Sequence, residues 1–185
     1  RQVLDLEDWS AAGRYVADLS DNPWADGRQA FVTAFAAART GERARTEALL
    51  PRLGDPDADP RIHVEVLELR ALLALLDRDA DEAVALARQA AEIEEGLPFE
   101  FGPPASLKPP HELLGDILLE VGRADEAVEA FRASLRFTPG RTLSLMGLSV
   151  AATAAGQHDV AADAEARLDA AWANAEPGFR ERVGR

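Results

Sequence analysis

The chain has 185 residues, a formal net charge of −13 and no cysteine. This length suffices for one domain with a sizeable core, and the lack of cysteine excludes disulfides and cysteine-ligated metal sites. The acidic excess argues against nucleic acid as a partner, because Lys and Arg supply most of the affinity for phosphates. No apolar run approaches the roughly 20 residues of a membrane-spanning helix, so we expect no membrane insertion. A cysteine-free chain is also compatible with a reducing, cytoplasmic compartment.

Alanine is abundant, and no alternating strand pattern is sustained, so the sequence predicts an all-α fold. The first expected helix covers 4–19, where Leu6, Trp9 and Val16 recur at helical spacing. A Ser-Asp-Asn-Pro turn at 20–23 provides capping residues for the next helix.

Two helical hairpins are expected next, at 27–60 and 64–97. In the first, Gly41 marks the turn and the second helix is short, at about 42–53. In the second, Asp77-Arg78 stands where a glycine turn is expected.

The segment 97–110 (LPFEFGPPASLKPP) interrupts the pattern. Its prolines exclude a helix or a central strand. Phe99 and Phe101 make it too apolar for a free linker, so we expect it to be ordered, with one of them buried near Leu72 and Leu119.

The block 108–141 has the length and residue pattern of a tetratricopeptide repeat (TPR). Gly115 and Ala127 are expected to face each other at a close helix crossing, with Phe131 filling space nearby. A weaker copy follows at 142–175, where Glu165 replaces the aromatic residue, as in an atypical terminal repeat. Together these patterns predict a right-handed α-solenoid of TPR-like helical hairpins in a single domain, 1–185.

A longer stretch, about 22–172, resembles the C-terminal part of long bacterial TPR proteins. The strings NPWADG, FAAARTGE and PFEFGPPASLKPPHELLGDILLEVGRADEAVEAFRASLRFTPGRTLSLMGLSVAATAAGQ carry this resemblance. It implies a fragment of a larger protein, with an internal boundary at Arg1. It implies no reaction that can be assigned to these positions.

Catalytic and metal-binding patterns are not found in the sequence. His63, His111 and His158 lie in different repeats, and none has a second ligand at metal-site spacing. Carboxylates spaced four apart, such as Glu112 and Asp116, have no neighbouring base or nucleophile. We therefore expect no enzymatic activity, no cofactor and no metal.

The first helix of each TPR hairpin lines a concave groove, and the expected groove is acidic in its middle and apolar at its ends. Such a groove favours a protein or peptide partner that is neutral or basic. The apolar stripe of Leu143, Met146 and Val150 either packs on a C-terminal cap at 170–182 or contacts a partner. The preferred function is a non-enzymatic protein-interaction module, and the alternative is a structural arm of a larger enzyme or sensor whose active region lies upstream. The candidate groove residues are Phe31, Phe35, Glu65, Glu68, Leu72, Phe99, Phe101, Glu112, Asp116 and Glu120.

Overall fold

A computed structural model describes Trp9, residues 23–98 and residues 107–173 of the chain. The predicted helix at 4–19, apart from Trp9, and the proposed burial of Phe99 or Phe101 lie outside these residues. The sequence predicts a single domain, whereas the chain divides into two compact units, Arg1–Pro110 and His111–Arg185. We call them unit 1 and unit 2 and describe each by itself.

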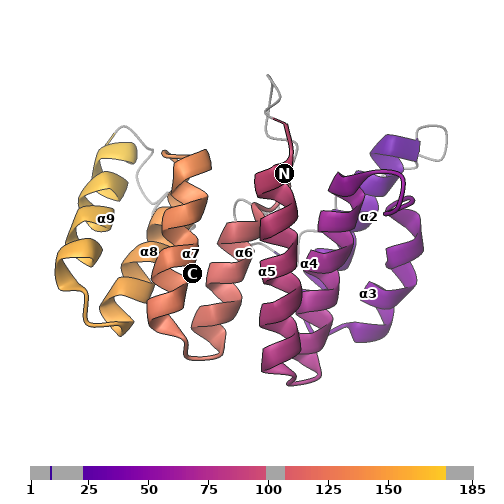
Figure 1. Ribbon diagram of the computed structural model, residues 1–185, viewed down its shortest axis with the longest axis horizontal. Coiled ribbons are helices and arrows are strands. Elements are labelled where there is room, and N and C mark those ends of the chain that lie inside the picture. Colours follow the sequence, from indigo (N-terminus) through magenta and orange to yellow (C-terminus); the bar gives the residue numbers. More distant parts are fainter. Residues whose placement is uncertain (1–8, 10–22, 99–106, 174–185) are drawn as a thin grey trace. The chain divides into compact units, whose positions relative to one another are not determined.

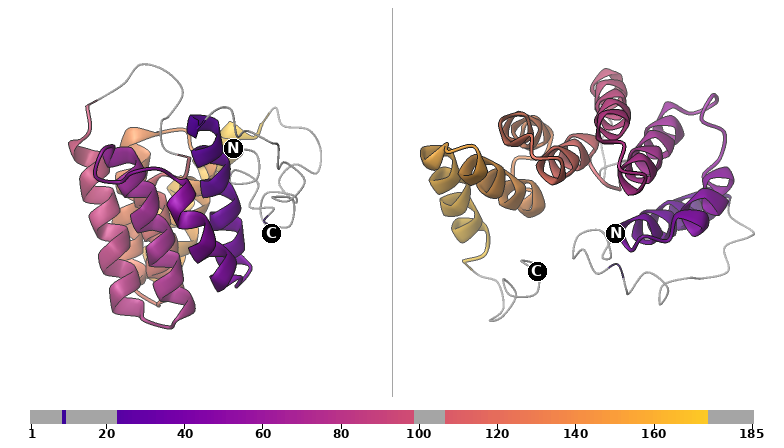
Figure 2. Two further views of the ribbon diagram at one scale, coloured as in Figure 1. Left: turned by 90° about the vertical axis from the view of Figure 1, so that its right-hand side faces the viewer. Right: turned by 90° about the horizontal axis from the view of Figure 1, so that it is seen from below.

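Unit 1 contains two helical hairpins in its described part. Helix α2 (Pro23–Arg39) is followed by α3 (Arg43–Leu49), and α4 (Pro60–Leu76) by α5 (Ala80–Gly96), with a short 3₁₀ turn, η2 (Leu50–Arg52), after α3. The two helices of each pair lie side by side and antiparallel, and α2 also packs on α4 (Figures 1 and 2).

Unit 2 repeats this arrangement. Helices α6 (Pro110–Glu120) and α7 (Ala124–Phe137) form one hairpin, and α8 (Thr142–Ala154) and α9 (His158–Ala171) form the next. Helix α8 packs against both α7 and α9, so the two hairpins of this unit share a core.

Each hairpin turns through three residues with one common geometry. After α6, the N–H of Gly122 donates to the carbonyl of Leu119 (3.0 Å), and the N–H of Arg123 donates to the carbonyl of Leu118 (2.8 Å). This is a Schellman motif, whose central residue adopts the left-handed conformation that glycine tolerates best. The central residues of the described turns are Gly41, Arg78, Gly122 and Gly156, with φ between 62° and 81°.

Arg78 is the one non-glycine residue at the central position of these described turns, with φ 62°. A side chain in this conformation is strained by about 1–2 kcal/mol. We expect Arg78→Gly to raise the free energy of unfolding by about 0.5–1 kcal/mol, because relief of strain exceeds the extra entropy of an unfolded glycine. Urea denaturation measures this. The matched substitution Gly122→Arg should lower stability, and a loss of stability in Arg78→Gly would contradict the assignment.

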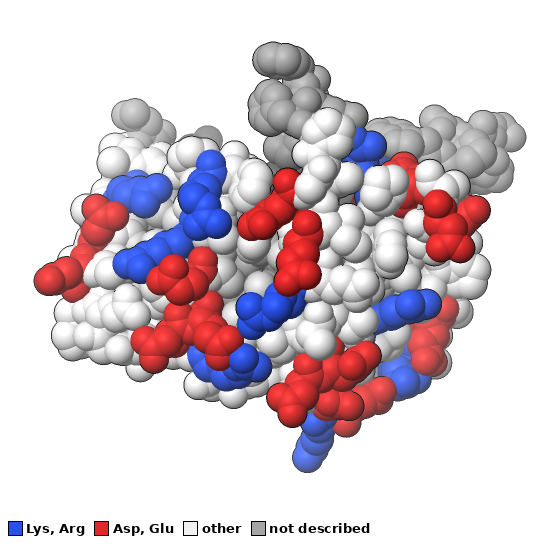
Figure 3. All heavy atoms as spheres, in the orientation of Figure 1, with Lys and Arg blue, Asp and Glu red and all other residues white. Residues whose placement is uncertain are grey.

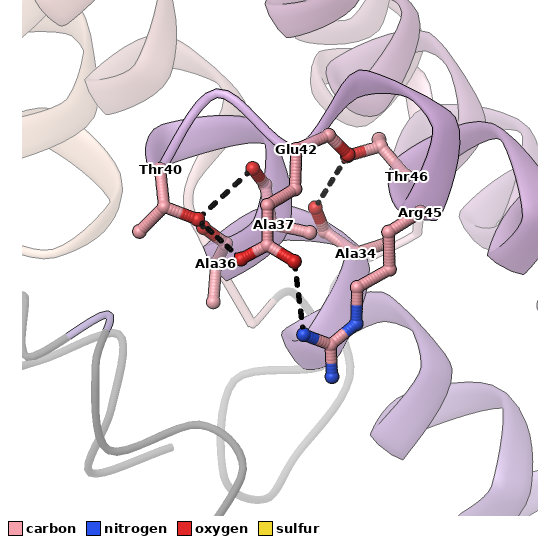
Figure 4. A network of polar contacts seen from close by, with 7 residues as sticks. All are labelled: Ala34, Ala36, Ala37, Thr40, Glu42, Arg45 and Thr46. Atoms are coloured by element: carbon pink, nitrogen blue, oxygen red, sulfur yellow. Dashed lines mark hydrogen bonds and ion pairs between the residues drawn. The ribbon is translucent and has the colours of Figure 1, made fainter.

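A polar network closes the turn between α2 and α3 (Figure 4). The Thr40 hydroxyl lies 3.0 Å from one Glu42 carboxylate oxygen, and Arg45 donates to the other at 3.1 Å. Hydrogen bonds from Arg45 and Thr40 lower the pKa of Glu42. The buried Thr46 hydroxyl lies 3.3 Å from the carbonyl of Ala34, which holds the short α3 against α2.

A fork-shaped ion pair connects the first hairpin to the second. Arg43, at the start of α3, donates from Nε and Nη2 to the two carboxylate oxygens of Asp77, both at 2.9 Å. This hydrogen bonding lowers the pKa of Asp77. Both side chains are about half exposed, so the pair fixes geometry more than it adds stability.

The core of unit 2 is organised around Phe131, which is fully buried. A Cβ added to Gly115 would lie 2.7 Å from its ring, and one added to Gly147 would lie 2.3 Å from it. The nearest atoms to that position on Gly115 therefore belong to Phe131 rather than to Ala127, its expected neighbour. The Phe131 ring, which belongs to α7, therefore lies between Gly115 of α6 and Gly147 of α8.

Candidate binding surface

Most of the predicted groove residues that the structure describes are buried rather than open to a ligand. Each of these residues is at most 2% exposed, and their role in binding a partner stays a prediction. The physical reason for their burial is that these first-helix positions are used for packing within each unit. The buried residues are Phe31, Phe35, Glu68, Leu72 and Glu112.

Phe35 of α2 is in ring contact with Trp9 from the N-terminal segment. The ring centroids of Trp9 and Phe35 are 5.4 Å apart, and those of Phe31 and Phe35 are 5.8 Å apart. Such tilted pairs are favourable arrangements for aromatic rings. Helical spacing alone identified Trp9 as apolar but could not show which surface it covers.

Glu65, on α4, is half-buried and electrostatically perturbed. The pKa of this carboxyl is raised to about 7, chiefly by burial; the charge of Arg28 lowers it and the charge of Asp59 raises it by smaller amounts. Unit 1 therefore carries a carboxyl group that changes its charge near neutral pH.

This pKa gives the protein a stability that depends on pH. Because the folded state binds the Glu65 proton more tightly than the unfolded state, stability falls as pH rises from about 4.5 to about 7. We expect Glu65→Gln to match the wild type at pH 5 and to be more stable by about 1–2 kcal/mol at pH 8. Thermal denaturation at both pH values measures the difference. An equal effect of Glu65→Gln at both would show that ionisation is not the cause.

In unit 2, Glu112 belongs to a buried polar network. Arg141 Nε and Nη2 donate to its two carboxylate oxygens at 2.6 and 2.8 Å. The Ser144 hydroxyl donates to Glu112 Oε2 at 2.5 Å and lies 2.9 Å from the hydroxyl of Ser134. The network joins α6, α7 and α8, so Glu112 holds hairpins together instead of facing a ligand.

The other predicted carboxylates of α6 reach the surface. Asp116 is half-buried and Glu120 is exposed, one helical turn apart. On α8, Met146 is half-buried and Val150 is 59% exposed. The hydrogen bond between Ser144 and Glu112 places α8 beside α6. We call Asp116, Glu120, Met146 and Val150 the inner surface of unit 2.

The expected cap over the apolar stripe lies mostly outside the described residues, and Leu143 of that stripe is buried. Val150 is exposed to solvent, unlike the buried core residues of α8. The sequence left this exposure undecided, because an apolar stripe at groove positions either packs on a cap or contacts a partner.

A hollow of about 480 Å³ lies over α7, α8 and α9. Basic and acidic side chains interleave over α7 and α9 (Figure 3). Arg132 donates to Glu129 at 2.7 Å, and Arg167 donates to the carbonyl of Pro139 at 3.0 Å, so these arginines serve local contacts. The hollow is lined by Arg132, Leu135, Arg136, Leu148, Asp159, Val160, Asp163 and Arg167.

Within the described ranges, no group of three or more His, Cys, Asp or Glu side chains is arranged to hold a metal ion. In the same part of the chain, no helix combines the length and the apolar character required to cross a bilayer.

Comparison with known proteins places the fold. No family model matches the chain, and no curated protein matches it. Two solved structures are similar to this chain. The MamA D159K mutant is 23% identical, and the match covers 92% of this chain and 97% of that chain. MamA AMB-1 is 24% identical, and the match covers 98% of this chain and 97% of that chain. Both have a TM-score of 0.51, and this likeness concerns the fold alone. The predicted fold class is confirmed: in the residues that the structure describes the chain is all-α, and each unit is built of TPR-like helical hairpins.

Proposed function

We propose that the chain is a non-enzymatic protein-interaction module, and that the inner surface of unit 2 binds a peptide or a partner helix. The observation that carries this proposal is the exposure of Val150, 59%, on a helix whose neighbouring apolar positions are buried. Met146, one helical turn before Val150, is half-buried, so the two side chains together offer apolar contact area on one side of α8.

The chemistry of this surface suggests its partner. Asp116 and Glu120 offer negative charge, while Met146 and Val150 offer apolar contact and, in methionine, an adaptable side chain. A neutral or basic amphipathic helix has the complementary pattern, with apolar residues on one side and Lys or Arg beside them. Since a stable interface buries about 800 Å² on each partner, further residues of the chain must contribute.

Site-specific photocrosslinking tests the proposal in cells that express the protein. A photoreactive amino acid at Val150 should form crosslinks to a partner protein, whereas the same group at Glu129 should not. Glu129 is a suitable control because its side chain is 69% exposed and lies on the second helix of its hairpin. Equal crosslinking at both positions, or none at Val150, would favour the alternative of a structural arm.

Charge reversal tests whether the surface of the partner is positively charged. We expect Asp116→Lys combined with Glu120→Lys to reduce the captured partner at least fivefold, with Glu129→Lys as the matched control. The wild-type interaction should weaken as the salt concentration rises. Salt screens the attraction between exposed charges, and at 0.1 M the screening length is about 10 Å. Unchanged capture by the double variant would exclude an electrostatic contribution from these carboxylates.

A further inference from the structure

The hollow over α7, α8 and α9 is bounded by α7 and α9, which run parallel and in register. Gln157, just before α9, donates to Asp125 near the start of α7 at 3.1 Å. Arg167, toward the end of α9, donates to the carbonyl of Pro139, just after α7, at 3.0 Å. The starts of α7 and α9 therefore lie level with each other, and so do their ends (Figure 1). The hollow measures about 480 Å³, which is within the range of about 300–1,000 Å³ for ligand pockets.

The charged side chains of this hollow are sorted by sign along its length. Asp159 and Asp163 come from the first half of α9, and Arg167 comes from its second half. Arg132 and Arg136 come from the second half of α7. Because the two helices are parallel, the aspartates lie toward one end of the hollow and the three arginines toward the other. This concentration of arginine stands out in a chain whose net charge is −13.

Most N–H groups of these arginines remain available to a ligand. Arg132 donates from Nη1 to Glu129 at 2.7 Å. Nη1 of Arg167 lies 3.8 Å from Asp163. Arg136 is exposed and forms no hydrogen bond or ion pair with the part of the chain that the structure describes. A guanidinium carries five N–H donors in a planar fork that fits a carboxylate. The arginine end therefore has room for a carboxylate beside the contacts that it already makes.

The floor between the charged ends is apolar. Leu135 and Leu148 are buried, and Val160 is half-buried. An apolar floor between opposite charges matches a peptide with an acidic residue, apolar side chains and a basic residue in that order along the hollow. The aspartates argue against a polyanion such as nucleic acid, whose phosphates they would repel.

We propose that this hollow binds an extended peptide segment of a partner protein, with a carboxylate at the arginine end and a basic residue near Asp159. The length fits about four to five residues. Asp159 and Arg167 are about 12 Å apart along α9 at 1.5 Å per residue, and an extended chain rises about 3.3 Å per residue.

This site is separate from the inner surface of unit 2, and the proposal does not depend on the function proposed for that surface. Leu148 belongs to the hollow and Val150 to the inner surface. The two residues are two positions apart, which places them about 200° apart around α8 at 3.6 residues per turn.

The helix dipoles give a second explanation for the sorted charges. Acidic side chains near the start of a helix and basic ones near its end stabilise that helix without any ligand. If this were their whole role, removal of an arginine would change stability and leave peptide binding unchanged. Binding therefore separates the two explanations.

The first experiment titrates the peptide acetyl-Lys-Leu-Val-Leu-Glu-amide into the full chain labelled with ¹⁵N. Amide NMR signals should shift in a saturable way around the hollow, in α7 and α9. Arg136→Gln should raise the dissociation constant about fivefold or more, because it removes the guanidinium that has no other described partner. Arg70→Gln is the matched control, since Arg70 is an exposed arginine of α4 in unit 1 and its loss changes the net charge equally. The absence of saturable shifts, or equal dissociation constants for the three proteins, would overturn the proposal.

A thermodynamic cycle then tests whether the carboxylate meets the arginine. A second peptide carries Gln in place of Glu. This change should weaken binding about fivefold or more in the wild type but by less than about twofold in Arg136→Gln, because the partner of the carboxylate is already gone. Thermal denaturation verifies that each variant is folded. An equal loss of affinity in both proteins, or a lower melting temperature of Arg136→Gln with unchanged peptide binding, would show that these arginines serve the helices alone.

Discussion

Glu112→Gln is expected to lower the free energy of unfolding by about 3–5 kcal/mol, which is the range for breaking a buried ion pair from one side. The side chain of Glu112 is 1% exposed and that of its partner Arg141 is 9% exposed. Glutamine retains the shape of the side chain but not its charge, so the Arg141 guanidinium loses the negative charge of Glu112. In this variant the Ser144 hydroxyl also loses the carboxylate to which it donates and faces a neutral amide group instead. Chemical denaturation of both proteins measures the loss.

A double-mutant cycle separates the ion pair from simple packing. Arg141→Leu removes the charge left behind, so the double variant with Glu112→Gln should be more stable than Glu112→Gln alone. The surface pair Arg132–Glu129, 42% and 69% exposed, provides the matched control. Glu129→Gln should change stability by less than about 0.5 kcal/mol. A similar small effect for Glu112→Gln would contradict the buried network.

Gly147→Ala should destabilise the protein by about 2–3 kcal/mol, although alanine is normally preferred to glycine inside a helix by about 1 kcal/mol. The added Cβ would lie 2.3 Å from two atoms of the Phe131 ring. Phe131 is fully buried, and Gly115 bounds it on another side, so the ring cannot move away easily. Overpacking therefore reverses the usual sign of the substitution.

Gly96→Ala is the control for Gly147→Ala. Gly96 is the last residue of α5, and a Cβ there meets no atom within 4 Å, so alanine should be neutral or stabilising. Adding Phe131→Leu to Gly147→Ala should recover part of the lost stability, because the smaller side chain admits the extra methyl group. Thermal denaturation compares these three variants with the wild type. A neutral Gly147→Ala would mean that the ring is not confined between the glycines.

The repeat pattern predicted the fold class but not the burial of the candidate surface. A repeat position shows which side of a helix a residue occupies, and on that basis Glu112 and Asp116 are equivalent. The difference between them comes from Arg141, 29 residues away in the sequence, which no local pattern connects to Glu112.

Local spacing also did not identify Gly147. Its contact with Phe131 crosses from one hairpin to the next, whereas a repeat pattern relates positions within a single repeat. The covering of Phe35 by Trp9 is a contact of the same long-range kind. Turn chemistry, in contrast, is local, and the irregular Asp77-Arg78 turn was visible in the sequence.

The network around Glu112 has a consequence for how unit 2 opens. In a stack of repeats, each hairpin is held by its interface with the neighbouring hairpin. Here separation of α8 from α6 would expose a carboxylate, a guanidinium and two hydroxyls that have lost their partners. That cost couples the opening of the α8–α9 hairpin to the integrity of the α6–α7 hairpin. The amides of α6, α7 and α8 should therefore exchange with solvent in one cooperative opening, and local fluctuations of this part of the chain should be confined to α9.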